Sequence, residues 1–301
     1  MSPLLILPLI FLPVVLVVAG LFVLKWRDRR DARRLPVDAK AFPNQAGAQI
    51  RQRLEEGSDG FWSVAAMAMF AGPMIPLVIL VSEARQKAPE LFNFGAWPIA
   101  TYLVILVGGV FVLLRQARLH VLTMRRCREG LAAELATAHG LQSLIPEGLL
   151  VFHDLPADGF NIDHVVVSKS VVFAIETKSR KKPAATGKAS ARVRYDGKAL
   201  HFPDHVATKP LEQAARQARW LAEHLSGATG NPVRVIPVLA LPGWFVEQAV
   251  SLPLAGNDVR VINPKNPAFM HKLNFGPVMA DDQRRRIAWA LNKRYGDMAE
   301  D

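Results

Sequence analysis

A hairpin-like stretch at residues 160–178 constrains the fold more than any other part of the chain. Two runs rich in β-branched and aromatic residues, at 165–167 and 171–175, flank a short polar segment, Ser168-Lys169-Ser170. Apolar runs separated by turn residues predict two short, largely buried strands joined by a tight turn. The stretch therefore predicts an antiparallel hairpin that the rest of its domain must cover.

Three charged side chains interrupt this apolar hairpin: Asp163, Glu176 and Lys178. Side chains alternate along a strand, so Glu176 and Lys178 share one face. Buried charges are costly unless they pair with one another or bind a metal. Two carboxylates can hold Mg²⁺ or Mn²⁺ through oxygen, and a lysine beside the cation can orient or deprotonate a water molecule. A purely structural ion-pair cluster is the alternative, and the spacing leaves both open.

Five short segments around this hairpin carry a resemblance: residues 130–134, 151–155, 161–167, 173–178 and 210–217. Together they resemble the NERD (nuclease-related domain) family of the PD-(D/E)xK nuclease superfamily, over about residues 126–265. The resemblance implies a restriction-endonuclease-like core, a mixed sheet flanked by helices, and a metal-dependent nuclease site. In that site Asp163 and Glu176 would hold Mg²⁺ or Mn²⁺, and Lys178 would activate water.

The resemblance also implies roles for two helix residues. Glu134 would bring a third acidic group to the site from the first core helix, and Gln213 on the second core helix would lie near the scissile phosphate. On spacing alone, Glu134 is an ordinary solvent-facing glutamate. Gln213 shares one helix face with Gln217, four residues later, and a solvated face is the structural alternative.

A basic stretch at residues 178–198 follows the hairpin. Phosphate contacts need only positive charge and reach, so this stretch predicts binding to nucleic acid, with a solvated loop as the alternative. The formal net charge of the chain is +11. Most of it lies after residue 115, which suits nucleic acid or an anionic membrane surface. The predicted nucleic-acid contacts are Lys181, Lys182, Arg192 and Arg194.

Three uncharged apolar runs precede the hairpin, and they predict membrane spans at about residues 4–24, 62–82 and 97–114. A helix needs about 20 apolar residues to cross the hydrocarbon core. Arginines are concentrated between the first two runs and after the third, so the positive-inside rule puts these regions in the cytoplasm and the N-terminus outside. The expectation is an integral protein of the bacterial inner membrane, with a transmembrane region at 1–115 and a cytoplasmic domain at 116–301.

The expected fold class is α/β, because a helix, three strands, a helix and a further strand follow one another in the C-terminal part. A three-helix transmembrane region would precede this domain. The single cysteine excludes an intrachain disulfide, and no His/Cys set has zinc-binding spacing. The interpretation is a membrane-anchored, Mg²⁺-dependent nuclease acting on DNA. The alternative is a catalytically silent module, tethered to the membrane, that binds nucleic acid or another protein.

Overall fold

The computed structural model describes residues 45–54, 81–82, 84–87, 96–182, 191–250, 253 and 256–297. The chain divides into two compact units, one of residues 1–38 and 53–126, the other of residues 39–52 and 127–301. The predicted domain boundary at residue 115 stays a prediction.

Helix α4 (Ala96–Leu141) is one continuous helix. It contains residues 97–114, predicted as the third membrane span, and runs on through the helix expected after residue 115. No helix in the described part of the chain is long and apolar enough to cross a membrane. The predicted span at 4–24 and nearly all of the span at 62–82 lie outside the described residues. The structure thus gives no support to the three-helix transmembrane region.

A five-stranded mixed sheet forms the centre of the second unit, with the strand order β1-β2-β3-β7-β9. Its strands are β1 (Leu150–Pro156), β2 (Asn161–Val167), β3 (Val172–Thr177), β7 (Val235–Ala240) and β9 (Arg260–Ile262). The first three are antiparallel neighbours, while β7 and β9 run parallel to β3. A mixed α/β architecture with helices flanking the sheet was predicted, and the structure confirms it.

Strands β2 and β3 form the predicted hairpin, with Val167 paired to Val172. Ser168 closes the turn, because its Oγ donates to the carbonyl of Val171 at 2.7 Å and accepts the backbone N–H of Ser170 and of Val171. Every residue of β3 is buried. Strand β3 is therefore a continuous apolar run, residues 172–175, followed by a buried carboxylate, Glu176.

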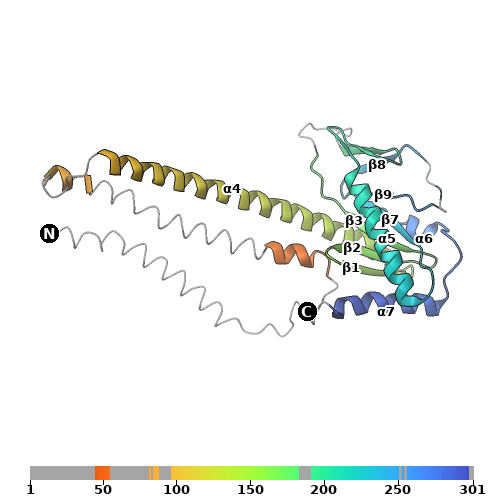
Figure 1. Cartoon of the computed structure of the whole chain (residues 1–301). Coiled ribbons are helices and arrows are strands. Elements are labelled where there is room, and N and C mark those ends of the chain that lie inside the picture. Colours follow the sequence, from red (N-terminus) through yellow and green to blue (C-terminus); the bar gives the residue numbers. More distant parts are fainter. Residues whose placement is uncertain are drawn as a thin grey trace. The chain divides into compact units, whose positions relative to one another are not determined.

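Helices cover both faces of this sheet. On one face lie α5 (Lys209–Thr229) and α7 (Asp281–Asp297), and Figure 1 shows α5 crossing the strands. Leu211, Ala214, Ala218, Leu221 and Leu225 recur every three or four residues along α5 and are all buried. The end of α4, the short helix η3 (Gln142–Leu144) and α6 (Phe269–Lys272) pack on the other face.

A second, four-stranded sheet has the order β6-β5-β4-β8. Its strands are β4 (Arg192–Tyr195), β5 (Leu200–His201), β6 (Val206–Ala207) and β8 (Phe245–Gln248). A tight turn joins β4 and β5, with Gly197 at φ 90°. Val193, Trp244 and Leu239 share one apolar core, so the small sheet packs against β7 of the main sheet.

Candidate active site

Two carboxylates, Asp163 and Glu176, lie on adjacent strands of the hairpin. The register pairs His164 of β2 with Ile175 of β3. Because the strands are antiparallel, the next position along them places Asp163 beside Glu176. Asp163 is held by the backbone N–H of Thr177, which donates to Oδ2 at 2.6 Å. Burial raises the pKa of Asp163 well above its ordinary value of 3.8, and the charges of Glu176 and then Glu134 raise it further.

Glu176 is only 3% exposed, and both of its carboxylate oxygens have partners. Lys178 Nζ lies 2.5 Å from Oε1, as expected for side chains two residues apart on one face of a strand. Gln217 of α5 donates from Nε2 to Oε2 at 2.6 Å and to the carbonyl of Asn161 at 3.2 Å. The hairpin charges that the sequence singled out therefore do come together, with an amide from α5 added.

Glu134 reaches the same region from α4. Thr177 at the end of β3 donates through Oγ1 to Thr137 Oγ1 at 3.2 Å, which ties the strand to this part of the helix. Glu134 lies one turn before Thr137, and its charge acts on Asp163. The resemblance placed a third acidic group here, whereas spacing alone predicted an ordinary surface glutamate. The role of Glu134 as a third acidic group of the site stays a prediction.

Residues 45–52 pack beside Glu134, which the sequence did not indicate. Gly47 has a φ of 73°, and a Cβ atom added there would lie 2.3 Å from Leu131 Cδ1 and 3.4 Å from Glu134 Oε2. Only a glycine fits this approach to α4. The backbone N–H of Gln49 donates to Asp154 Oδ2 at 2.9 Å. The segment is thus anchored to α4 on one side and to β1 on the other.

Gln217 is the glutamine of α5 that contacts Glu176, whereas Gln213 was predicted to lie near the scissile phosphate. Gln213 lies one turn earlier on α5 and is half-buried. Gln217 is 3% exposed, and it is this side chain that donates to Glu176. The predicted role of Gln213 near the scissile phosphate stays a prediction.

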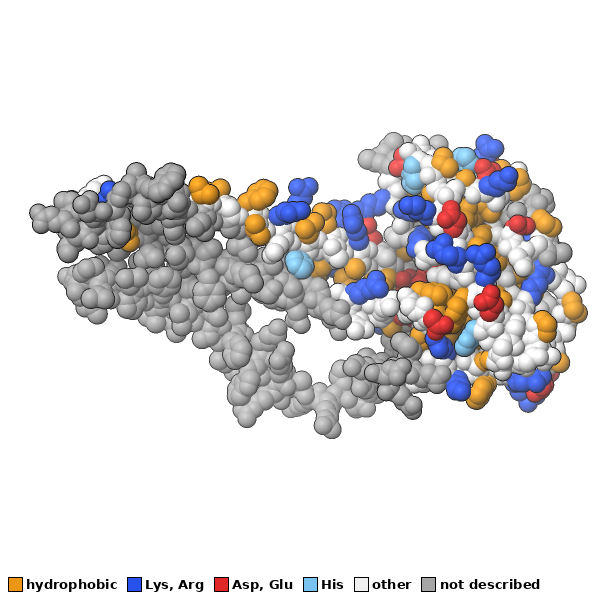
Figure 2. Space-filling model, viewed as in Figure 1, with side chains coloured by type: hydrophobic (Ala, Val, Ile, Leu, Met, Phe, Trp, Pro, Cys, Tyr) orange, Lys and Arg blue, Asp and Glu red, His pale blue; other side chains and the backbone are white. Residues whose placement is uncertain are grey.

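The predicted nucleic-acid contacts lie in two places. Lys181 and Lys182 follow β3, and Lys181 Nζ pairs with Glu129 Oε1 of α4 at 3.0 Å. Arg192 and Arg194 project from the exposed side of β4, because the residues that alternate with them are buried. Lys and Arg side chains also recur across the face of the second unit shown in Figure 2.

The oxygen atoms at this site suit a divalent cation that keeps some of the water molecules of its hydration shell. Among the described residues, no three His, Cys, Asp or Glu side chains are grouped closely enough to hold a metal ion. Mg²⁺ at phosphate-processing sites is commonly held by one or two carboxylates, with water and substrate phosphates completing the shell. Gln217 Oε1 adds a buried oxygen for which the described residues supply no hydrogen-bond partner. Asp163, Glu176 and Gln217 therefore fit a cation completed by water or phosphate, and do not form a closed cage.

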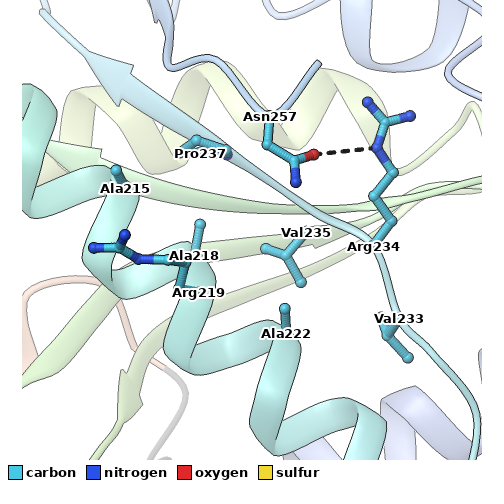
Figure 3. Close-up of a pocket in the computed structure, with 9 residues that line it drawn as sticks. All are labelled: Ala215, Ala218, Arg219, Ala222, Val233, Arg234, Val235, Pro237 and Asn257. Atoms are coloured by element: carbon cyan, nitrogen blue, oxygen red, sulfur yellow. Dashed lines mark hydrogen bonds between the residues drawn. The ribbon is translucent and has the colours of Figure 1, made fainter. Parts of the chain in front are cut away.

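A separate pocket of about 310 Å³ lies between α5 and the start of β7 (Figure 3). Alanine, valine and proline side chains form most of its wall, with Arg219, Arg234 and Asn257 at its edge. Arg234 is engaged in holding the fold: Nε donates to Asn257 Oδ1 at 3.4 Å, and its two terminal nitrogens donate to the carbonyls of Phe275 and Gly256. The pocket wall contains no carboxylate, so the acidic cluster on the hairpin remains the candidate site.

Comparison with known proteins identifies one family over this part of the chain. No curated protein and no solved structure matches the chain. One family model matches over a span that begins near the end of α4 and stops before β8. That span contains Glu134, Asp163, Glu176, Lys178 and Gln217, and it is narrower than the region of resemblance predicted from the sequence. Residues 129–242 of this chain match the family model described as nuclease-related domain (NERD).

Proposed function

We propose that this protein is a metal-dependent nuclease that hydrolyses phosphodiester bonds in DNA. One observation carries the proposal: Asp163 and Glu176 meet on facing strands, with Lys178 Nζ 2.5 Å from Glu176. A buried carboxylate, Glu176, beside a half-buried one, Asp163, with a single nearby lysine forms an arrangement that a divalent cation would stabilise. The nuclease-related domain match over the same residues supports it.

Each side chain has a defined role in this proposal. Asp163 and Glu176 hold Mg²⁺ or Mn²⁺, which would polarise a phosphoryl oxygen and neutralise developing charge. Lys178 orients or deprotonates the attacking water, as a general base must lie within hydrogen-bond reach of the proton that it takes. Glu134 supports the cation electrostatically from α4. Gln217 fixes the orientation of Glu176 through Oε2.

A second candidate, a silent binding module, is favoured by one specific observation. Lys178 and Gln217 between them provide a partner for both carboxylate oxygens of Glu176. A buried ion pair completed by a hydrogen bond can be purely structural. In that case the domain would bind nucleic acid without cleaving it, or would bind a protein partner.

A cleavage assay on the purified full chain separates the two candidates. Labelled DNA and RNA are incubated with Mg²⁺ or Mn²⁺, and EDTA provides the control. Metal-dependent cleavage that an Asp163→Asn variant lacks is the expected result. Tight binding with no cleavage of either nucleic acid by the unchanged protein would select the silent module.

Nucleic-acid binding is expected to depend on the four predicted basic residues. Their combined replacement by alanine should weaken duplex DNA binding and make the slope of log affinity against log salt shallower, by about 0.9 for each phosphate that is no longer bound. Titrations at several salt concentrations in EDTA measure both quantities. Lys181 should contribute least, because Glu129 already pairs with it. An unchanged slope would mean that these residues do not touch phosphate.

Membrane attachment is the other part of the proposal. The uncharged runs at 4–24, 62–82 and 97–114 motivate it.

Reporter fusions test the expected topology. Fusions after residue 55 and at residue 301 should report the cytoplasm, and a fusion at residue 88 should report the outside. Arginine asymmetry between the loops is the physical reason. A cytoplasmic signal at residue 88 would refute a three-span arrangement, and recovery of the full chain in the soluble fraction would refute membrane attachment altogether.

A further inference from the structure

The outer side of the small sheet carries an exposed aromatic ring beside an arginine. Strands β4 and β8 run parallel, with Arg192 paired to Phe245 in the register. Phe245 is 59% exposed, and the Arg192 guanidinium lies over its ring, 5.3 Å from the centroid. We call these two residues the Arg192–Phe245 platform. They face outward because Val193 and Trp244 fill the apolar core beneath the sheet.

A single exposed phenylalanine is ordinary on a protein surface and by itself indicates nothing. The charged residues around the Phe245 ring indicate which kind of ligand could bind there. Arg194 lies two residues after Arg192 on the same side of β4. Glu247 opposes Arg194 in the register, so part of the positive charge is balanced at that end of the strand. The Arg192 end is therefore the more favourable one for an anionic ligand.

A track of cations connects the platform with the candidate active site. The backbone N–H of Lys178 donates to the carbonyl of Ala240 at 3.0 Å. Two residues further on, the Arg180 carbonyl accepts from Trp244 Nε1 at 3.2 Å. The chain after β3 thus follows the segment that leads directly into Phe245.

Lys182 continues this track toward β8. Its Nζ would lie 4.0 Å from a Cβ atom added at Gly243, two residues before Phe245. Arg180 and Lys182 are both exposed. Positive side chains thus run from Lys178 at the site to the platform, and a nucleic-acid backbone that followed them would pass Phe245.

We propose that the Arg192–Phe245 platform binds single-stranded nucleic acid, with Phe245 stacking on an unpaired base and Arg192 contacting the adjacent phosphate. The proposal rests on the proposed function only in taking nucleic acid as the ligand. Aromatic side chains stack on bases of any sequence, and a basic groove beside them tracks the backbone. Bases in a duplex are stacked on each other and offer no free face to the ring. The platform therefore directs the protein toward single strands or the single-stranded ends of duplexes.

The test measures binding by the full chain in EDTA, so that no cleavage takes place. Fluorescence anisotropy follows a labelled single strand and a duplex of the same length at several salt concentrations. Phe245→Ala should weaken single-strand binding by roughly fivefold or more, the scale expected when one base no longer stacks on an aromatic ring. Duplex binding should change by less than about twofold, because the remaining interactions are electrostatic.

Variants of differing chemistry make the result specific to stacking. Phe245→Leu keeps an apolar side chain without a π face, so it should behave like the alanine variant, while Phe245→Trp should bind at least as well as the unchanged protein. Val206→Ala is the matched control, since Val206 is 60% exposed on β6 of the same sheet. It should leave binding unchanged. Arg192→Ala, unlike Phe245→Ala, should make the single-strand salt slope shallower by about 0.7.

Several outcomes would overturn the inference. One is that Phe245→Ala weakens single-strand and duplex binding equally, and another is that Phe245→Leu binds single strands as tightly as the unchanged protein. The inference would also fail if Val206→Ala weakened single-strand binding as much as Phe245→Ala does, or if the unchanged protein did not bind single strands. Competition by anionic lipid vesicles that depends on Phe245 would assign the platform to a membrane surface. The proposed function is tested separately, by measuring cleavage with Mg²⁺. The protein could bind single strands through Phe245 without cleaving them, and it could cleave DNA without binding through Phe245, so the two tests fail independently.

Discussion

Replacing Asp163 by asparagine is expected to lower the rate of DNA cleavage strongly and to abolish the rise in melting temperature that Mg²⁺ or Mn²⁺ causes in the unchanged protein. A ligand that binds only the folded state stabilises it, by about 2.7 kcal/mol at a hundred times its dissociation constant. Without Asp163, the cation loses one of two carboxylates. Cleavage should fall by roughly a hundredfold or more, since the charge stabilisation that a cation supplies is worth several kcal/mol. Thermal melts with and without metal, and initial cleavage rates, measure the two effects.

Glu176→Gln should give the same loss, and Glu212→Gln provides the control. Glu212 lies exposed in the first turn of α5, on the helix that carries Gln217 but away from the hairpin. Its replacement should leave the metal response and the cleavage rate unchanged. A melting temperature of the unchanged protein that ignores both metals up to millimolar concentration would end the metal-dependent proposal.

The raised pKa of Asp163 adds a dependence on pH in the absence of metal. The interval that matters is the pH range between the ordinary pKa of aspartate, 3.8, and the raised pKa of Asp163 in the folded protein. In this range the unfolded chain has lost the proton of the Asp163 carboxyl group, while the folded protein still retains it. Stability therefore falls as the pH rises through that interval, and above it the charged Asp163 destabilises the apo protein. The asparagine variant lacks this cost. It should melt at a higher temperature than the unchanged protein in EDTA at neutral pH, and acidification should narrow the difference.

The hairpin and its charges could be predicted from the sequence because local rules determine them. Successive β-branched residues, a serine turn and the two-residue spacing of Glu176 and Lys178 each fix a property of neighbours in the chain. The structure shows the predicted turn and the predicted shared face. The helices flanking the sheet follow from the same kind of periodicity, as the apolar spacing along α5 illustrates.

The parts that the sequence did not indicate depend on contacts between distant segments. Which of two glutamines reaches Glu176 depends on how far α5 extends past the end of β3, and no local pattern records that position. Residues 45–52 reach the site region where Gly47 packs beside Leu131 and Glu134. Phe245 looks like a strand residue in the sequence, and it gains meaning only because β8 pairs with β4 and brings it beside Arg192.

Lys178→Ala is expected to lower the cleavage rate by roughly a hundredfold or more, the usual scale for a general base, while the metal-induced rise in melting temperature survives. In EDTA the variant should be less stable than the unchanged protein, because Glu176 is 3% exposed and loses its cationic partner. Breaking a buried pair typically costs about 3–5 kcal/mol. If Glu176 is a metal ligand, Mg²⁺ should restore most of this loss. In a purely structural cluster the loss would be the same with and without metal.

Two further lysine variants separate the chemistry of Lys178 from its charge. Lys181→Ala breaks an exposed pair with Glu129, so its effect on stability should stay below about 1 kcal/mol and should not respond to metal. Lys178→Arg keeps the positive charge beside Glu176, but a guanidinium does not give up its proton at any working pH. A lysine that deprotonates water should therefore be as poorly replaced by arginine as by alanine. If the arginine variant instead retains a large part of the cleavage rate, Lys178 acts through its charge, by orienting water or stabilising the developing phosphorane.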